Sequence, residues 1–300
     1  MIPLFDLHCD TFLELYKNKY KFDDAPLHIS LNKIKCFSPY IQICAIWSEK
    51  HLSNNDAFIN YKNTLSYIKA LNLPLCKSAC DFSSISFILA VEDARILGNK
   101  INRLDELFND NVRILTLNWK GVSCVGGGWD TNVGLTPFGL DVVKNCFKKG
   151  IVVDLSHSSE NVQNEVISLA QGFNVSPIFS HSNSFSICNH KRNITDVTFK
   201  KIAKLNGLVG ISLFPEHLSI NGNANTSVIL NHIEHFLNLG GEKSICLGCD
   251  FDGISSLPIG FKSISDLPML YALIEKYFSK EVANRIFFLN AYNFFIKNLK

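Results

Sequence analysis

The chain has 300 residues, of which 47% are hydrophobic and 19% are charged, and its formal net charge at pH 7 is +2. This composition is typical of a globular protein, and the length suits one large α/β domain or two smaller ones. Lysine and arginine are dispersed along the chain, which excludes the concentrated basic surface that a nucleic-acid binder uses.

Membrane insertion and secretion are not indicated either. No apolar run reaches the roughly 18 residues that a membrane helix needs, and the N-terminus lacks a basic region followed by an apolar signal core. Ten cysteines are scattered along the chain. Cys44 and Cys246 lie inside apolar runs, where a free thiol behaves as a small buried hydrophobe. We therefore expect a cytoplasmic protein with reduced thiols.

Short apolar runs separated by amphipathic stretches recur along the whole chain. Most runs are continuously apolar, which predicts strands covered on both faces, as in a parallel sheet. In chain order, the predicted strands are residues 2–8, 40–47, 86–92, 112–119, 151–157, 177–181, 207–214 and 244–250. The predicted helices are residues 55–71, 101–109, 137–149, 159–170, 195–205, 227–239, 265–278 and 280–298.

Eight strands alternating with helices predict an α/β fold of the (β/α)8 TIM barrel type. A doubly wound open sheet is the alternative. The chain shows no linker composition and no repeat at a fixed spacing, so residues 1–300 are predicted to form a single domain.

Six ionisable side chains stand at the C-terminal ends of predicted strands, where barrel enzymes carry their catalytic groups. They are His8, Asp10, Glu92, His157, His181 and Asp250. His8 and Asp10 are two residues apart at a strand end and can bind one ion together. His157 and His181 follow neighbouring strands and can bind a second ion, with Glu92 as a bridge. Imidazole and carboxylate ligands suit zinc, and two ions about 3.5–4 Å apart can acidify a shared water for hydrolysis.

Several of these residues also have a purely structural interpretation. A single histidine at a strand end is more often a hydrogen-bonded group than a metal ligand. Asp6 can accept from a backbone N–H or orient His8, and Asp10 with Thr11 can cap the helix that follows. Cys9 points away from its neighbours on the strand and is predicted to be structural. The shared position of all six residues favours the metal site.

A glycine-rich segment at 122–137, VSCVGGGWDTNVGLTP, follows the fourth predicted strand. Three consecutive glycines can cradle a phosphate, but the segment lacks the GK[ST] signature of such loops. We predict a flexible substrate loop over the barrel mouth. Trp129 within it either packs on the substrate or anchors the loop.

The motifs around these residues resemble those of the membrane (renal) dipeptidase family of zinc metallopeptidases, nearly from end to end. They are DLHCDT at 6–11, AVEDA at 90–94, VDLSHSS at 153–159, SHSNS at 180–184, KRNITD at 191–196 and LGCDFDG at 247–253. The resemblance implies a barrel of the metal-dependent hydrolase type with two Zn²⁺ per chain. It also implies cleavage of dipeptides, including some with a C-terminal D-residue, and a homodimer.

The resemblance assigns His8 and Asp10 to one zinc and His157 and His181 to the other, with Glu92 as the bridging catalytic carboxylate. It makes Asp250 the catalytic acid and base near the bridging water. Arg192, with its neighbour Asn193, would bind the substrate's terminal carboxylate, because a guanidinium offers two parallel donors to two oxygens.

This chain departs from the family pattern in two places. Asp93 and Ala94 follow Glu92, where the family commonly has two glycines. Trp119 stands where mammalian members carry a histidine that polarises the scissile carbonyl, and tryptophan donates only through its indole N–H. Carbonyl polarisation would therefore fall to the metal alone, to Asn118 or to a loop residue, and Trp119 is expected to bind the substrate.

Two other functions remain open from the residues alone. One is a metal-dependent hydrolase of another small amide, lactam or lactone, since a fold does not define a substrate. The other is a non-catalytic metal-binding barrel that acts through a protein partner. Arg192 separates the dipeptidase from the hydrolase of neutral substrates, because a neutral substrate would not need this cation.

Overall fold

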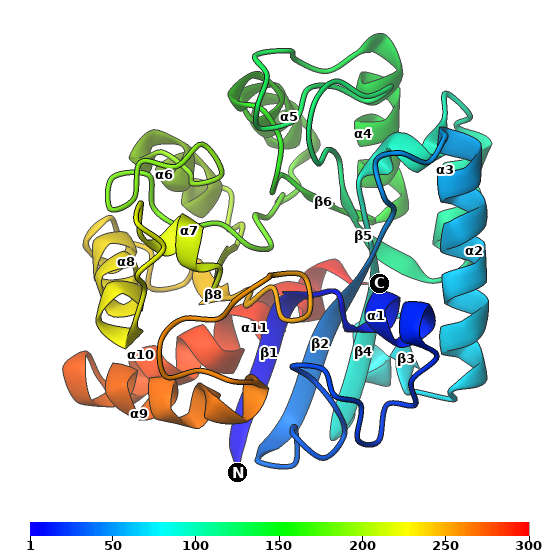
Figure 1. The fold of residues 1–300 in the computed structure, drawn as a ribbon. Coiled ribbons are helices and arrows are strands. Elements are labelled where there is room, and N and C mark those ends of the chain that lie inside the picture. The colour runs from blue at the N-terminus through cyan, green and yellow to red at the C-terminus, as the bar shows by residue number, and fades with distance from the viewer. Residues whose placement is uncertain (300) are drawn as a thin grey trace.

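A computed structural model describes residues 1–299 as a parallel sheet surrounded by helices (Figure 1). The strands pair in the order β6-β5-β4-β2-β1-β8-β7, and a short strand, β3, pairs with β4 beside this order. Their bounds are β1 Ile2–Cys9, β2 Phe37–Trp47, β3 Leu75–Cys76, β4 Ile85–Glu92, β5 Val112–Thr116, β6 Val152–Asp154, β7 Val209–Ile211 and β8 Ile245–Leu247. All of these pairings are parallel.

The two ends of this sheet, β6 and β7, are joined by residues 178 and 179. Ile178 pairs with Asp154 of β6, and Phe179 pairs with Val209 of β7, both in parallel. The N–H of Ile178 also donates to the carbonyl of Val153 at 3.0 Å. The sheet therefore closes into a barrel, which confirms the (β/α)8 prediction over the open sheet.

Residues 177–181 were predicted to form a full strand, but only the two residues 178 and 179 pair with their neighbours. Beyond these two residues, the carbonyl oxygen of Ser180 packs closely against Gly210 of the neighbouring strand β7 and against Gly248, which follows β8. A Cβ atom built on Gly210 would lie 1.9 Å from this oxygen, and one on Gly248 would lie 1.8 Å from it. Backbone hydrogen bonds to β7 nevertheless continue past residue 179, since the N–H of Ser182 donates to the carbonyl of Gly210 at 2.8 Å.

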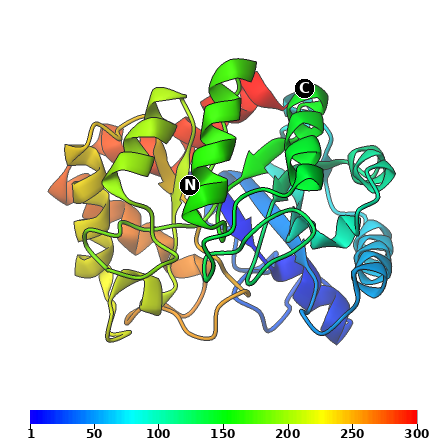
Figure 2. The same ribbon diagram turned by 90° about the horizontal axis from the view of Figure 1, so that it is seen from above.

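Helices lie around the outside of the barrel, as Figure 2 shows from above. They are α1 Thr11–Asn18, α2 Asn54–Ala70, α3 Asn102–Asn109, α4 Pro137–Lys149, α5 Glu160–Phe173, α6 Asp196–Lys204, α7 Pro215–Leu218, α8 Thr226–Asn238, α9 Leu267–Tyr277, α10 Lys280–Asn284 and α11 Asn290–Asn298. None of these helices within residues 1–299 combines the length and apolar character needed to cross a membrane.

The predicted helices agree with the observed ones to within three residues at each end, with one exception. The predicted helix 280–298 is divided into α10 and α11 by a π-helical turn at Arg285–Leu289. The four residues of α7 are too few to show a helical period, and this helix was not predicted.

The apolar runs are buried on both faces, as predicted. Phe5 and Leu7 of β1 point into the barrel with residues of the other strands, whereas Leu4 packs outward against the helices. The N-terminal end of the barrel is closed by α11, where the ring of Phe295 stacks on Phe5 at 5.1 Å. Cys44 and Cys246 are fully buried in these cores, which confirms the role predicted for them. The polar residues gather at the opposite end.

Candidate metal centre and substrate cleft

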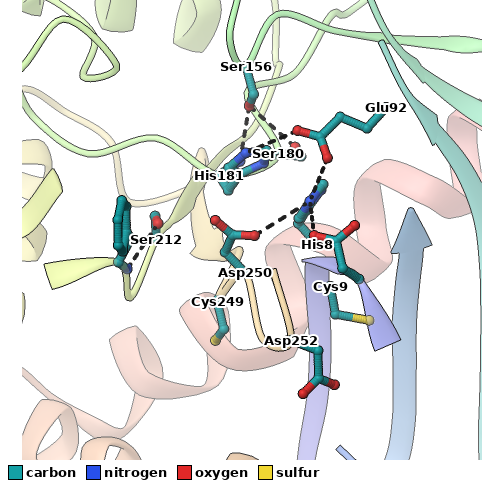
Figure 3. A network of polar contacts seen from close by, with 12 residues as sticks. His8, Cys9, Glu92, Ser156, Ser180, His181, Ser212, Cys249, Asp250 and Asp252 are labelled. Atoms are coloured by element: carbon teal, nitrogen blue, oxygen red, sulfur yellow. Dashed lines mark hydrogen bonds and ion pairs between the residues drawn. The ribbon is translucent and has the colours of Figure 1, made fainter. Parts of the chain in front are cut away.

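The C-terminal ends of the barrel strands bring the five predicted metal ligands together, and Figure 3 labels three of them, His8, Glu92 and His181. His8 is the penultimate residue of β1, Asp10 follows that strand directly, and Glu92 ends β4. His157 and His181 lie on the loops that follow β6 and the paired residues 178 and 179. All are buried except His157, which is partly buried.

Glu92 lies between two sets of side chains. Its Oε1 is 2.8 Å from His157 Nε2 and 3.9 Å from His181 Nε2. Its Oε2 is 3.7 Å from His8 Nε2, which is also 3.7 Å from Asp10 Oδ2. Two groups of potential ligand atoms, each spanning no more than 4.8 Å, therefore share the carboxylate of Glu92.

Asp250 stands at the edge of the same cluster, on the loop that follows β8. Its Oδ1 lies 3.7 Å from His8 Nε2. Asp250 also forms a third group of potential ligand atoms with His8 and His181. Figure 3 shows the side chains of His8, Glu92 and Asp250 pointing toward one another. With Asp10, this cluster places three carboxylates in a buried volume, and cations would offset their mutual repulsion.

The chemistry of these donors fits divalent metal ions. His8 Nε2 and Asp10 Oδ1 are buried without any hydrogen-bond partner, which is costly unless a ligand completes them. Burial lowers the pKa of His157 and of His181 well below the usual range, so both imidazoles are neutral, as metal ligands must be. A mixed set of imidazole nitrogens and carboxylate oxygens suits zinc among the transition metals.

A hydrogen-bonded chain behind His181 defines which of its nitrogens is free. Asp154 accepts the Ser180 hydroxyl at 2.6 Å and the N–H groups of Ser156 and Ser180 at 3.0 and 2.8 Å. Because the single hydroxyl hydrogen of Ser180 goes to Asp154, the Ser180 oxygen accepts from His181 Nδ1–H at 2.8 Å. The lone pair of His181 therefore sits on Nε2, facing the cluster.

Asp154 and Ser180 were not singled out from the sequence. Both lie inside motifs that carry the family resemblance, VDLSHSS and SHSNS. An acidic residue in a strand that leads to a predicted metal ligand is a signal that could have identified Asp154. Metal-bound histidines commonly donate their second N–H to such a partner. Here the partner carboxylate acts through a serine hydroxyl, which residue spacing does not reveal.

The structure decides between the two interpretations of Asp6. Its Oδ1 accepts from the N–H of Cys249 at 2.9 Å and from the N–H of His8 at 3.4 Å. Asp6 thus holds the backbones of β1 and the β8 loop together, and within residues 1–299 no hydrogen bond joins it to the His8 ring. Cys9 is fully buried with its sulfur 3.5 Å from that of Cys44, which confirms its structural role.

The capping interpretation of Asp10 and Thr11 is wrong. Asp10 precedes α1, but its side chain accepts no hydrogen bond from the first turn of that helix. The Thr11 hydroxyl donates to Asp252 Oδ2 at 2.6 Å, and Asp252 Oδ1 accepts from the N–H of His28 at 2.5 Å. Asp10 is therefore free for the cluster, while Asp252 secures the loop after β8.

Arg192 is a buried cation with an unused pair of donors. It is 5% exposed, and its Nε and Nη2 atoms have no hydrogen-bond partner. These two N–H groups lie on the same edge of the guanidinium and form the parallel fork that binds a carboxylate. Burial lowers the pKa of Arg192 to about 10, while the charges of Glu92 and Asp250 oppose this shift, so the side chain is cationic at neutral pH.

Asn193, in contrast, uses its amide within the protein. Its Nδ2 donates to the carbonyls of Cys188 at 2.9 Å and of His217 at 2.8 Å. Its Oδ1 accepts from the N–H of Asn183 at 3.2 Å. These bonds fix the loop that carries Arg192.

A cleft of about 200 Å³ opens beside the cluster. It is lined by Asp10, Leu13, Glu14, Lys17, Trp47, Glu92, Trp119, His157, Asp250, Asp252 and Gly253. The ring of Trp119 lies 5.1 Å from that of Trp47 and 6.1 Å from that of His157. Trp119 therefore forms an aromatic wall of the cleft next to a predicted ligand.

The glycine-rich segment is attached to the loop that carries His157. The N–H of Trp129 donates to the carbonyl of His157 at 2.8 Å, and Gly128 pairs with Ser158. The Trp129 ring lies 5.9 Å from His190 and does not line the cleft. Of the two interpretations of Trp129, the structure therefore favours the one in which it anchors the loop.

A closed α/β barrel with a cluster of potential metal ligands at the C-terminal ends of its strands is an architecture shared with metal-dependent hydrolases. The sequence profile of the membrane dipeptidase family, peptidase family M19, matches residues 1–295. The chain belongs to this family of metallo-dipeptidases, which confirms the predicted resemblance.

Similar proteins agree with this assignment. An uncharacterized dipeptidase of Schizosaccharomyces pombe is 27% identical over an alignment of 310 positions, which covers 90% of this chain and 74% of the relative. The solved structure of dipeptidase AC, a metallopeptidase of family M19, has a TM-score of 0.92 at 23% identity and covers 99% of both chains. A metallopeptidase from Rhodobacter sphaeroides, solved with a phosphinate mimic of L-Ala-D-Ala, has a TM-score of 0.92 at 22% identity, covering 100% of this chain and 99% of the other. These two structures share the fold.

Proposed function

We propose that this chain hydrolyses dipeptides that carry a free C-terminal carboxylate, including dipeptides with a C-terminal D-residue, with the help of two zinc ions. The observation that carries the substrate class is the unused N–H fork of Arg192, buried close enough to Glu92 and Asp250 for their charges to act on it. The inclusion of D-residues is supported by the L-Ala-D-Ala mimic bound to the Rhodobacter sphaeroides metallopeptidase.

In this proposal, His8 and Asp10 would hold one ion and His157 and His181 would hold the other, with Glu92 between the two sets as the bridging residue. The distances from Glu92 Oε1 and Oε2 to the two sets of histidines support a bridging role. Two bound zinc ions supply a water of lowered pKa and a Lewis acid for the peptide carbonyl.

Asp250 is the proposed proton carrier. Burial raises its pKa to about 7, against the lowering effect of His8, so in the metal-free protein it exchanges its proton near neutral pH. A group of this kind can accept a proton from the attacking water and pass it to the leaving amine. Its position at the edge of the cluster, 3.7 Å from His8 Nε2, leaves its carboxylate facing the cleft.

The other residues act in binding. Arg192 grips the terminal carboxylate through two parallel hydrogen bonds. Trp119 packs against the substrate as a wall of the cleft, which replaces the polar contact of the mammalian histidine. Asn193 contributes by holding the loop of Arg192 in place, because its own amide is engaged with backbone groups.

Residues 1–300 are proposed to act as one hydrolase domain, since the barrel strands run from residue 2 to residue 247 and the family match covers residues 1–295. A homodimer and a cytoplasmic location stay predictions.

The test is turnover by the zinc-loaded protein of matched substrates. The panel contains free dipeptides with an L- or a D-residue in the second position and the C-terminal amides of these dipeptides. It also contains a neutral lactam and a neutral lactone. We expect the free dipeptides to be cleaved far faster than the rest, and Glu92→Gln to abolish cleavage. Glu275→Gln, at an exposed position of α9, is the matched control and should behave as the parent. Faster turnover of the neutral compounds would contradict the proposal.

A further inference from the structure

His217 is a buried histidine that the metal centre does not use. It lies in α7, on the loop that follows β7, and is 6% exposed. Its Nδ1 has no hydrogen-bond partner. A buried polar nitrogen without a partner is rare in a folded protein and costly unless a ligand completes it.

Three contacts join the segment of His217 to the loop that carries Arg192. The N–H of Arg192 donates to His190 Nδ1 at 3.2 Å. The ring of His190 lies 4.7 Å from the ring of His217, at an interplanar angle of 39°. Asn193, next to Arg192, donates to the His217 carbonyl at 2.8 Å. The loop at 190–193 and helix α7 therefore form one packed unit, and the ring of Phe214 meets the imidazole edge-on at 4.7 Å.

The protonation state of His217 allows its imidazole to act as an uncharged hydrogen-bond donor. Burial, and then the charge of Arg192, lower the pKa of His217 to about 2, so the imidazole is uncharged at neutral pH. A neutral imidazole carries one N–H donor. Next to Arg192, such a donor adds a hydrogen bond without placing a second positive charge in the same buried volume.

We propose that His217 is a second anchor for the substrate's terminal carboxylate, donating through Nδ1–H to one oxygen while the fork of Arg192 binds the carboxylate. The inference rests on the proposed dipeptidase function. A carboxylate has about four acceptor positions, so it can take the two bonds of the fork and the imidazole bond together. Arg192 and His217 both offer buried nitrogen atoms that form no hydrogen bond within the protein.

The test compares three substitutions in the zinc-loaded full chain on a free dipeptide and on its C-terminal amide. Asparagine places an N–H near the position of Nδ1, glutamine places one near the position of Nε2, and phenylalanine keeps only the ring. We expect His217→Phe and His217→Gln to lower kcat/KM for the free dipeptide about tenfold, mainly through KM. His217→Asn should retain most of the parent value, and zinc content should not change.

The amide is the internal control, because it lacks the charged group that His217 would bind, and it should lose little in any variant. His51→Phe, at an exposed histidine, should leave both substrates unaffected. Equal losses on the two substrates, or an unchanged KM for the free dipeptide, would overturn the role of His217 alone. If His217→Phe does not fold, equal values for the asparagine and glutamine variants overturn it. A parent that cleaves no free dipeptide would instead overturn the proposed function itself.

Discussion

Arg192 is the residue on which the preference for a free carboxylate depends most. Its Nε and Nη2 atoms are buried and unpaired, and each charge-assisted hydrogen bond is worth roughly 1.5–3 kcal/mol. Arg192→Met should therefore lower kcat/KM for a free dipeptide at least about tenfold. The C-terminal amide of the same dipeptide should be a poor substrate of the parent and lose little more in the variant. Similar losses on both substrates, measured side by side, would rule out carboxylate binding by Arg192.

Asp250 should matter for proton transfer more than for metal retention. Asp250→Asn keeps the shape of the side chain and removes its basic oxygen, so we expect kcat to fall roughly 10²–10⁴-fold, the usual contribution of a general acid or base. Zinc content, measured on the same sample, should equal that of the parent. A variant that loses both ions would show that Asp250 is primarily a ligand, in line with the group that it forms with His8 and His181.

For individual residues, a position at the C-terminal edge of the barrel could be predicted from sequence, because the shared direction of the strands alone brings the residues at their ends to one edge. The hydrogen-bond partners of individual polar atoms could not be predicted in this way. Asn193 appears beside Arg192 in a substrate motif, but its partners, Cys188 and His217, belong to other loops and no spacing relates them. The same holds for Thr11, whose partner Asp252 lies 241 residues away.

Among the elements, the loops after β6 and after residues 178 and 179 depend on Asp154, whose carboxylate accepts from Ser156 and Ser180. Asp154→Asn replaces one accepting oxygen by a donor, which removes the hydroxyl acceptor that orients Ser180 and, through it, His181. We expect zinc affinity to fall about 10–100-fold, the usual effect of losing a partner of a metal-bound histidine. Competition with a coloured chelator measures it.

The control for this substitution is Asp105→Asn, an exposed position on α3 that pairs only with Lys149 in the described part of the chain. It should keep the parent affinity. An unchanged affinity in Asp154→Asn would show that the Ser180 hydrogen bond does not orient His181 for metal binding.

The existence of the strands could be predicted from continuous apolar runs, but their lengths could not. β6, β7 and β8 have only three residues each, although backbone hydrogen bonds between neighbouring chain segments continue beyond them, as from the N–H of Leu213 to the carbonyl of Cys249 at 3.3 Å. The contacts of Ser180 with Gly210 and Gly248 join residues that are far apart in sequence. Likewise, the π-helical turn that divides the last predicted helix leaves its apolar pattern intact, so periodicity did not reveal it.

Across the whole molecule, the two ends of the barrel have different roles. The N-terminal end is filled by apolar side chains of the strands and of α11, and the C-terminal end holds the charged cluster and the cleft. This separation could be predicted from the order of the elements, because every strand runs in the same direction. Two ions, and zinc as the metal, were predicted from the imidazole and carboxylate side chains at the strand ends, whereas a dipeptide as the substrate was inferred from the family resemblance.

The central claim is that two zinc ions, held around Glu92, serve dipeptide hydrolysis. The most direct test is a titration of the metal-free full chain with zinc while the turnover of a free dipeptide is followed. We expect activity to rise and to level off at two zinc equivalents per chain, and His157→Ala to retain one equivalent and little activity. Full turnover with no added metal, or a plateau at one equivalent, would contradict the two-ion centre.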